Sequence, residues 1–97
     1  MNIFENIRTI IIEAAKSFGI NDKKILDKIT AEPPKEEIHG DISTNIALLS
    51  SKALNRNPRE LAENIGILLK KNNYIDEVKI AGPGFINLFL NKSIFYE

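Results

Sequence analysis

The residues with the clearest chemical potential lie near the end of the chain, where an aromatic ring, an amide and a second ring alternate. Phe85, Asn87 and Phe89 occupy the odd positions of an apolar segment, and the odd positions of a β-strand share one face. Aromatic rings stack on unpaired bases, and an amide can read the hydrogen-bonding edge of a base. The pattern permits a base-contacting row. It also permits a plainer interpretation, in which the rings pack and Asn87 bonds to backbone at a sheet edge.

Residues for catalysis or metal binding are scarce. His39 is the single histidine, and because no nucleophile motif accompanies His39 and Asp41 we predict a solvated loop histidine and no catalytic residue. Cysteine is absent, and the nearby carboxylates fit a polar loop, so that we expect no metal site. These carboxylates are Glu32, Glu36, Glu37 and Asp41.

The segment Gly82-Pro83-Gly84 suggests a phosphate-binding loop at first sight. It lacks the following Lys-Ser/Thr pair and leads into a strand instead of a helix. A tight turn between two strands explains the same residues, and we predict that turn.

Composition narrows the class of protein further. The chain has 97 residues, with 13 basic and 13 acidic side chains, which excludes the simplest nucleic-acid signature of a strongly basic domain. Its longest apolar run is Ile46-Ala47-Leu48-Leu49, which is too short for a membrane span or a signal peptide. The lack of cysteine fits a reducing compartment, and we predict a cytoplasmic protein with no membrane partner.

The first half of the chain is predicted to contain one long helix. Apolar residues at helical spacing favour a helix over residues 2–18, with Gly19 ending it and Ile20 folding back onto it. A weak helical turn is expected over 21–28 behind Asn21 or Asp22, and a strand over 29–32 that Pro33-Pro34 ends. Residues 35–42 are predicted to form a polar loop.

Two further helices are predicted next. Ser43 or Thr44 can cap the first, whose apolar face comprises Ile46, Leu49, Ala53 and Leu54 and which Asn55-Arg56 breaks. Asn57-Pro58-Arg59-Glu60 resembles a capping box and starts the second, which Asn72-Asn73 terminates. The buried stripe of this helix is predicted to comprise Leu61, Ala62, Ile65, Leu68 and Leu69.

The last third switches to a strand period. Residues 75–80 and 85–90 are predicted strands, and the even positions Ile86, Leu88 and Leu90 are expected to face the helices. The fold class is therefore α+β, with about three principal helices packed on one face of a small, mostly antiparallel sheet. We expect residues 1–90 to form a single domain and residues 91–97 to begin a connection to a domain absent from this chain.

Three blocks together resemble a known family. They are Gly40-Asp41-Ile42-Ser43-Thr44-Asn45-Ile46-Ala47, Asn57-Pro58-Arg59-Glu60-Leu61-Ala62 and Ala81-Gly82-Pro83-Gly84-Phe85-Ile86-Asn87. In this order and spacing they are similar to the N-terminal additional domain of bacterial-type arginyl-tRNA synthetases. With the opening helix, the resemblance covers essentially the whole chain.

The resemblance implies a domain that contacts the D-loop at the outer corner of tRNA. In that family an aromatic and an amide side chain after the Gly-Pro-Gly turn meet an exposed base, and these positions match Phe85 and Asn87. Phe89 and Lys79 are further candidates for tRNA contact. Six residues are interpreted as structural, through tight turns and local side-chain-to-backbone bonds: Gly40, Asp41, Asn45, Gly82, Pro83 and Gly84.

The resemblance also implies what this chain lacks. The nucleotide-binding motifs of the synthetase catalytic domain do not occur, so that we expect no cofactor in this piece, and no catalysis by it alone. The parent enzyme would use ATP with Mg²⁺ to attach arginine to its tRNA, and the partners would be that tRNA and the catalytic domain.

The alternative is a domain that docks on the rest of the synthetase without base contact. Phe89, Phe95 or Tyr96 would then be the interface anchors. The basic residues that could assist tRNA binding are Lys52, Arg56, Arg59, Lys70, Lys71 and Lys79.

Overall fold

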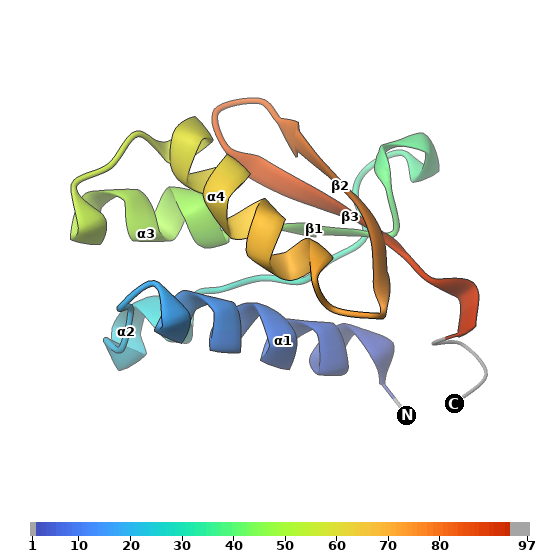
Figure 1. The fold of residues 1–97 in the computed structure, drawn as a ribbon, viewed down its shortest axis with the longest axis horizontal. Helices are drawn as coiled ribbons and strands as arrows, with labels where there is room; N and C mark the ends of the chain where they lie inside the picture. The colour runs from blue at the N-terminus through green and yellow to red at the C-terminus, as the bar shows by residue number, and fades with distance from the viewer. Residues whose placement is uncertain (1, 94–97) are drawn as a thin grey trace.

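The computed structural model describes residues 2–93 and shows an α+β fold (Figure 1). Its helices are α1 (Ile3–Ser17), α2 (Lys23–Leu26), the 3-10 turn η1 (Glu37–His39), α3 (Ile46–Leu54) and α4 (Pro58–Lys70). Its strands are β1 (Ile42–Thr44), β2 (Ile75–Ala81) and β3 (Phe85–Leu90). Within this range the three longer helices pack on a three-stranded antiparallel sheet, which confirms the predicted fold class.

The sheet has the order β1-β3-β2, so that β3 is its central strand. Both neighbours run antiparallel to β3, and Asn87 lies opposite Ser43 on one side and Lys79 on the other. An irregularity between Ile75 and Glu77 inserts Asp76 as an extra residue in β2. Because register decides which side chains share a face, this pairing determines the composition of the site described below.

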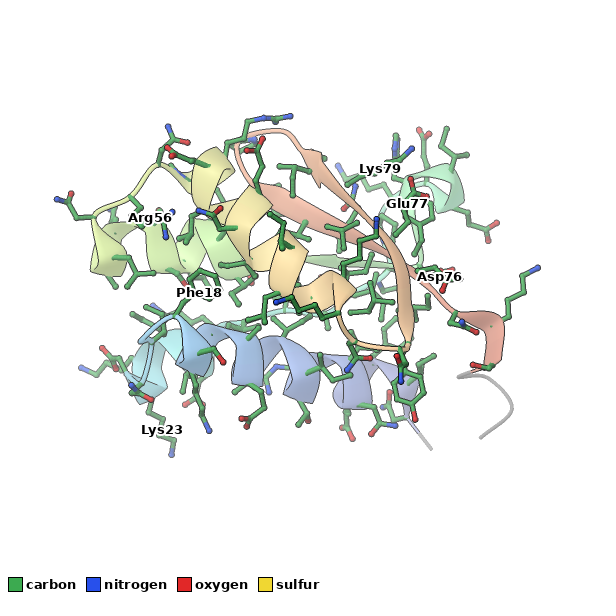
Figure 2. All side chains as sticks on the ribbon, in the orientation of Figure 1. Phe18, Lys23, Arg56, Asp76, Glu77 and Lys79 are labelled. Carbon is green, nitrogen blue, oxygen red and sulfur yellow. The ribbon has the colours of Figure 1, made fainter. Side chains whose placement is uncertain are left out.

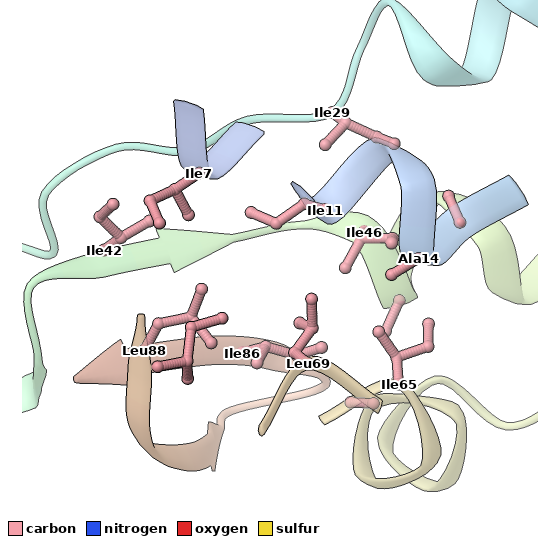
Figure 3. Close-up of a cluster of buried hydrophobic side chains, with 14 of the residues drawn as sticks. Ile7, Ile11, Ala14, Ile29, Ile42, Ile46, Ile65, Leu69, Ile86 and Leu88 are labelled. Atoms are coloured by element: carbon pink, nitrogen blue, oxygen red, sulfur yellow. The ribbon is translucent and has the colours of Figure 1, made fainter. Parts of the chain in front are cut away.

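One face of the sheet and the inner faces of the helices form a single apolar core. Ile86, Leu88 and Leu90 of β3 belong to it, as predicted, and Ile42 of β1 lies beside Leu88. Figure 3 shows isoleucine and leucine side chains of α1, α4, β1 and β3 converging in this cluster. Helix α4 contacts both α1 and β2 (Figure 1).

Asparagine side chains cap the starts of α1 and α4, of which only the Asn57 cap of α4 was predicted. Asn2 Oδ1 accepts from the backbone N–H of Phe4 at 3.0 Å, and Asn57 Oδ1 accepts from that of Glu60 at 3.1 Å. At the other end of α1, Gly19 has a φ of +92° and the Ile20 N–H donates to the Ala15 carbonyl. Ile20 is buried, so the predicted hydrophobic contact after α1 is confirmed.

The strand predicted over residues 29–32 is wrong. Only Glu32 bridges to the sheet, exchanging two backbone hydrogen bonds with Ser43. Pro33 and Pro34 have no N–H to donate, so the pairing cannot continue past Glu32. On the other side, the Thr30 N–H donates to the side chain of Asn45 instead of to a strand.

The start of α3 also differs from the prediction. Ser43 and Thr44 lie in β1, a strand that the sequence pattern did not indicate, and Asn45 is the residue that precedes the helix. Thr44 nevertheless helps to cap it, because its Oγ1 accepts from the Ile46 N–H at 3.3 Å. Three residues are too few for an alternating pattern to be recognisable.

The buried face of α3 is rotated from the predicted one. Ser50 and Ser51 are buried with Ile46, whereas Ala53 is exposed. Small residues are needed on this face because α3 packs against both α4 and β3. In α4, by contrast, Leu61, Ala62, Ile65 and Leu69 are buried as predicted, and Leu68 is half-buried.

No helix within residues 2–93 is long and apolar enough to cross a membrane. Phe95 and Tyr96, which the docking alternative named as anchors, lie outside the described residues.

Candidate functional site

The site lies on the face of the sheet opposite the helices, which we call the open face. It is formed by side chains that alternate with the core residues of the three strands. They are Ser43 of β1, Glu77, Lys79 and Ala81 of β2, and Phe85, Asn87 and Phe89 of β3. The central strand thus brings the predicted aromatic-amide-aromatic row to the middle of this face.

Phe85 presents the most exposed ring on the open face. Its relative exposure is 41%, an unusual value for a phenylalanine in the central strand of a sheet. The ring lies next to Gly82 of the preceding turn, where an added Cβ would stand 4.0 Å from Phe85 Cδ2. A flat apolar ring that protein atoms leave half uncovered is suited to stacking on another flat group.

The turn that positions Phe85 is held against the start of α4. Arg59 Nη1 donates to the Gly82 carbonyl at 2.7 Å. Gly84 has a φ of +147°, and a Cβ there would stand 3.1 Å from the Pro58 carbonyl oxygen, so that the turn can approach the helix closely. The two sequence blocks around Pro58 and Gly84 therefore form one structural unit.

Asn87 lies at the centre of the open face and is largely covered, with a relative exposure of 7%. No residue within the range 2–93 forms a hydrogen bond with its side-chain amide. The plainer interpretation, in which the Asn87 amide forms a hydrogen bond with backbone at a sheet edge, therefore does not hold. The amide retains a donor and an acceptor for a group that approaches this face.

Phe89 and Lys79 pack against each other at the far end of the row. The Lys79 Nζ lies 5.6 Å from the centroid of the Phe89 ring, within range of a cation–π interaction. The ring of Phe89 also faces Gly40, where a Cβ would stand 3.5 Å from its Cε2. Phe89 is half-buried, so that its ring is committed to packing within the domain to a greater extent than that of Phe85.

Asp41 and Asn45 make hydrogen bonds to distant segments, and not the local bonds that we predicted. Asp41 Oδ2 accepts from the Leu90 N–H at 2.8 Å. Asn45 Oδ1 accepts from the Thr30 N–H at 2.9 Å, and its Nδ2 donates to the Lys28 carbonyl at 3.1 Å. Both residues join parts of the chain that local turn chemistry could not join.

The basic residues do not gather on the open face. Lys79 lies on it beside Glu77, at 3.9 Å, and Arg59 lies at the turn before Phe85. Figure 2 shows Lys79 and Glu77 together on β2, whereas Arg56 lies at the opposite end of the molecule, next to the connection between α3 and α4. Lys70 and Lys71 are at the C-terminal end of α4. The open face is therefore polar and aromatic rather than strongly cationic.

The loop histidine does not form a catalytic arrangement with Asp41. Its Nε2 lies 3.7 Å from Glu36 Oε2, and both side chains are more than half exposed. Across residues 2–93, no group of three or more His, Asp or Glu side chains is arranged to hold a metal ion.

Ser43 is one of three open-face residues that the sequence reasoning missed, with Glu77 and Ala81. It was interpreted as a helix cap, whereas it lies in β1 directly opposite Asn87. Only the pairing of β1 with β3 reveals this position, because the two strands are separated by two helices and a further strand.

Comparison with known proteins identifies the family of this chain. A family model described as "Arginyl tRNA synthetase N terminal domain" matches residues 5–90. The chain is 42% identical to the arginine–tRNA ligase of Bartonella bacilliformis and 43% identical to that of Brucella suis. These matches cover 100% and 96% of the chain, respectively.

The chain spans only 17% of the length of each of these ligases. The match therefore concerns one domain of a much longer kind of protein. By both the family model and the relatives, the chain belongs to the arginyl-tRNA synthetase N-terminal domain family.

Proposed function

We propose that this chain is the tRNA-recognition module of an arginine–tRNA ligase and that its open face contacts an unpaired D-loop base at the outer corner of the tRNA. The observation that carries the proposal is the half-exposed ring of Phe85 on the same face as the amide of Asn87, which has no hydrogen-bond partner among residues 2–93. Residues 1–90 would act as one tRNA-binding domain, with residues 91–97 leading into the remainder of the ligase.

The chemistry of the open face suits a base better than a phosphate backbone. A base would stack on Phe85 and place its hydrogen-bonding edge over Asn87, two residues further along the same strand. Lys79 is the one basic residue of this face and is flanked by Glu77. Recognition by stacking and an amide requires little positive charge, which fits the zero net charge of the chain.

The experiment is to replace Phe85 with alanine in the full-length ligase that carries this domain. Loss of one stacked base raises the KM for tRNA by an amount that corresponds to about 1–3 kcal/mol. Phe4→Ala is the matched control, because Phe4 is similarly exposed, at 37%, but lies on α1. A KM for tRNA that is the same in the wild-type and Phe85→Ala enzymes contradicts base contact.

The activity of the whole protein is part of the same proposal. The ligase would attach arginine to its tRNA in the cytoplasm, with ATP and Mg²⁺ bound by its catalytic domain. No step of that reaction is assigned to residues of this chain.

A second candidate is a domain that docks on the rest of the ligase through its helices. It is favoured by Ile67, which is 64% exposed beside an apolar groove between α4 and β2 lined by Gly66, Val78 and Ile80. In this case the isolated domain would ignore tRNA but bind the remainder of the ligase when added in trans, and Ile67→Asp would weaken that binding. Retention of binding by Ile67→Asp contradicts docking through this groove.

A further inference from the structure

The open face contains a second polar side chain with no assigned role, next to Asn87 on the neighbouring strand. We propose that the hydroxyl of Ser43 is a specificity-determining contact to the same base that stacks on Phe85. This inference rests on the proposed function and extends the recognition site from β3 to β1.

The pairing of β1 with β3 brings Ser43 to this position. Ser43 and Asn87 are direct cross-strand partners, so their side chains project from the same face of the sheet. Neighbouring strands lie about 4.8 Å apart, a distance that the edge of a single base can bridge. Ser43 and Asn87 can therefore contact one base together.

The hydroxyl of Ser43 is available for such a contact. Ser43 is half-buried, and none of the residues between 2 and 93 forms a hydrogen bond with its Oγ. Its backbone N–H and carbonyl are both used in the bridge to Glu32, at 2.7 and 3.1 Å, which holds the residue in place. A hydroxyl on a backbone held from both sides is preorganised to donate to, or accept from, a ligand.

The side of Asn87 that faces β2 offers no equivalent group. Its partner there is Lys79, whose Nζ lies over the Phe89 ring and 3.9 Å from Glu77 Oε1. The ammonium group of Lys79 is thus engaged toward the Phe89 end of the row. A base that stacks on Phe85 and reaches Asn87 meets its second uncharged polar partner on β1.

The distances along the strand agree with this assignment. Phe85 and Asn87 are two residues apart, which corresponds to about 6.8 Å along an antiparallel strand. A base stacked on the ring and extending toward Asn87 spans this distance with its hydrogen-bonding edge over the Ser43–Asn87 pair. A hydroxyl and an amide side by side can satisfy a donor and an acceptor on adjacent atoms of one base.

The first test compares Ser43→Ala and Ser43→Thr in the full-length ligase. Removal of the hydroxyl raises the KM for tRNA about twofold to tenfold, as expected for one hydrogen bond, and leaves kcat unchanged. Threonine retains the hydroxyl and suits a strand, so that Ser43→Thr keeps the wild-type KM. Ser17→Ala is the matched control, because Ser17 is an α1 serine whose hydroxyl bonds within the helix.

The second test asks whether Ser43 and Phe85 contact the same base. A series of tRNAs, each lacking one D-loop base, identifies the position at which Phe85→Ala no longer changes the KM. If the proposal is right, the effect of Ser43→Ala disappears on that same tRNA. An effect that persists there, or the absence of any effect of Ser43→Ala on intact tRNA, overturns the role of Ser43. A Phe85→Ala enzyme with unchanged KM overturns the proposed function itself, so the two failures are distinguishable.

Discussion

Asp41 Oδ2 accepts a 2.8 Å hydrogen bond from the backbone N–H of Leu90, a residue 49 positions further along the chain. The Asp41 N–H donates in turn to the Leu88 carbonyl, also at 2.8 Å. The carboxylate therefore continues the pairing of β1 with β3 beyond the point at which β1 begins. It holds the end of the strand that carries Phe85, Asn87 and Phe89.

Replacement of Asp41 should destabilise the domain more when the new side chain has no hydrogen-bond acceptor for the Leu90 N–H. Asp41→Ala leaves the partly buried Leu90 N–H without its partner, and we expect a loss of about 1–3 kcal/mol in the free energy of unfolding. Asp41→Asn keeps an acceptor oxygen and loses less. Urea denaturation measures both, with exposed Glu63→Ala as the control that changes stability by less than about 0.5 kcal/mol. Equal losses for Asp41→Ala and Asp41→Asn would show that the acceptor oxygen does not account for the contribution of Asp41 to stability.

Asn45 is expected to stabilise the domain through two hydrogen bonds that substitutions can remove separately. Asn45→Ala removes the acceptor for Thr30 N–H and the donor to the Lys28 carbonyl, for an expected cost of about 1–3 kcal/mol at 0.5–1.5 kcal/mol per bond. Asn45→Asp retains the acceptor and should lie between Asn45→Ala and the wild type at neutral pH. Thermal unfolding of the three proteins provides the comparison. A local capping role for Asn45 predicts instead that Asn45→Asp is as stable as the wild type, since aspartate caps helices equally well.

Gly40 and Gly19 provide a matched pair for separating backbone strain from steric overlap. Both have a positive φ, +124° and +92°, but a Cβ at Gly40 would stand 2.9 Å from the Leu88 carbonyl oxygen, whereas Gly19 has no neighbour within 4 Å. We expect Gly19→Ala to cost about 1–3 kcal/mol through strain, and Gly40→Ala to cost more because β3 must also shift. Differential scanning calorimetry of both variants tests the order. Similar melting temperatures would mean that β3 can shift away from the new Cβ without a loss of stability.

The salt dependence of tRNA binding should be shallow for this domain. Lys79 is the single basic side chain of the open face, so Lys79→Ala is expected to lower the slope of log K against log salt by about 1 and to weaken binding similarly for different tRNA sequences. Lys23→Ala, a change at the exposed start of α2, is the control (Figure 2). Fluorescence titrations between low and moderate salt supply the slopes. A slope equivalent to six or more released ions would contradict recognition by stacking.

The parts of the fold that could be predicted from sequence are those determined by nearby residues. Asn57-Pro58 starts α4 because an amide cap and a fixed φ act within one turn, and the period of α1 shows in its own fifteen residues. β1 could not be predicted because its stability comes from β3, more than 40 residues away, and because Pro33 and Pro34 leave Glu32 as its sole partner on the other side.

The candidate site, like the fold, could be predicted only in the part that nearby residues determine. Alternation along β3 suffices to put Phe85 and Asn87 on one face, since both belong to the same strand. The deep burial of Asn87, the approach of Lys79 to Phe89 and the position of Ser43 all depend on strand register. Register is a tertiary property that composition and spacing do not contain.

The central place of β3 has a consequence for how the domain is made. β1 and β2 each pair with β3 and not with each other, and β3 is the last of the three strands in chain order. A nascent chain that ends before residue 85 therefore cannot form this sheet. The hairpin of β2 and β3 closes a short loop, whereas β1 must be recruited across α3 and α4, so the hairpin should form first. The surface that we propose for tRNA would thus be the last feature of the domain to exist during its own translation.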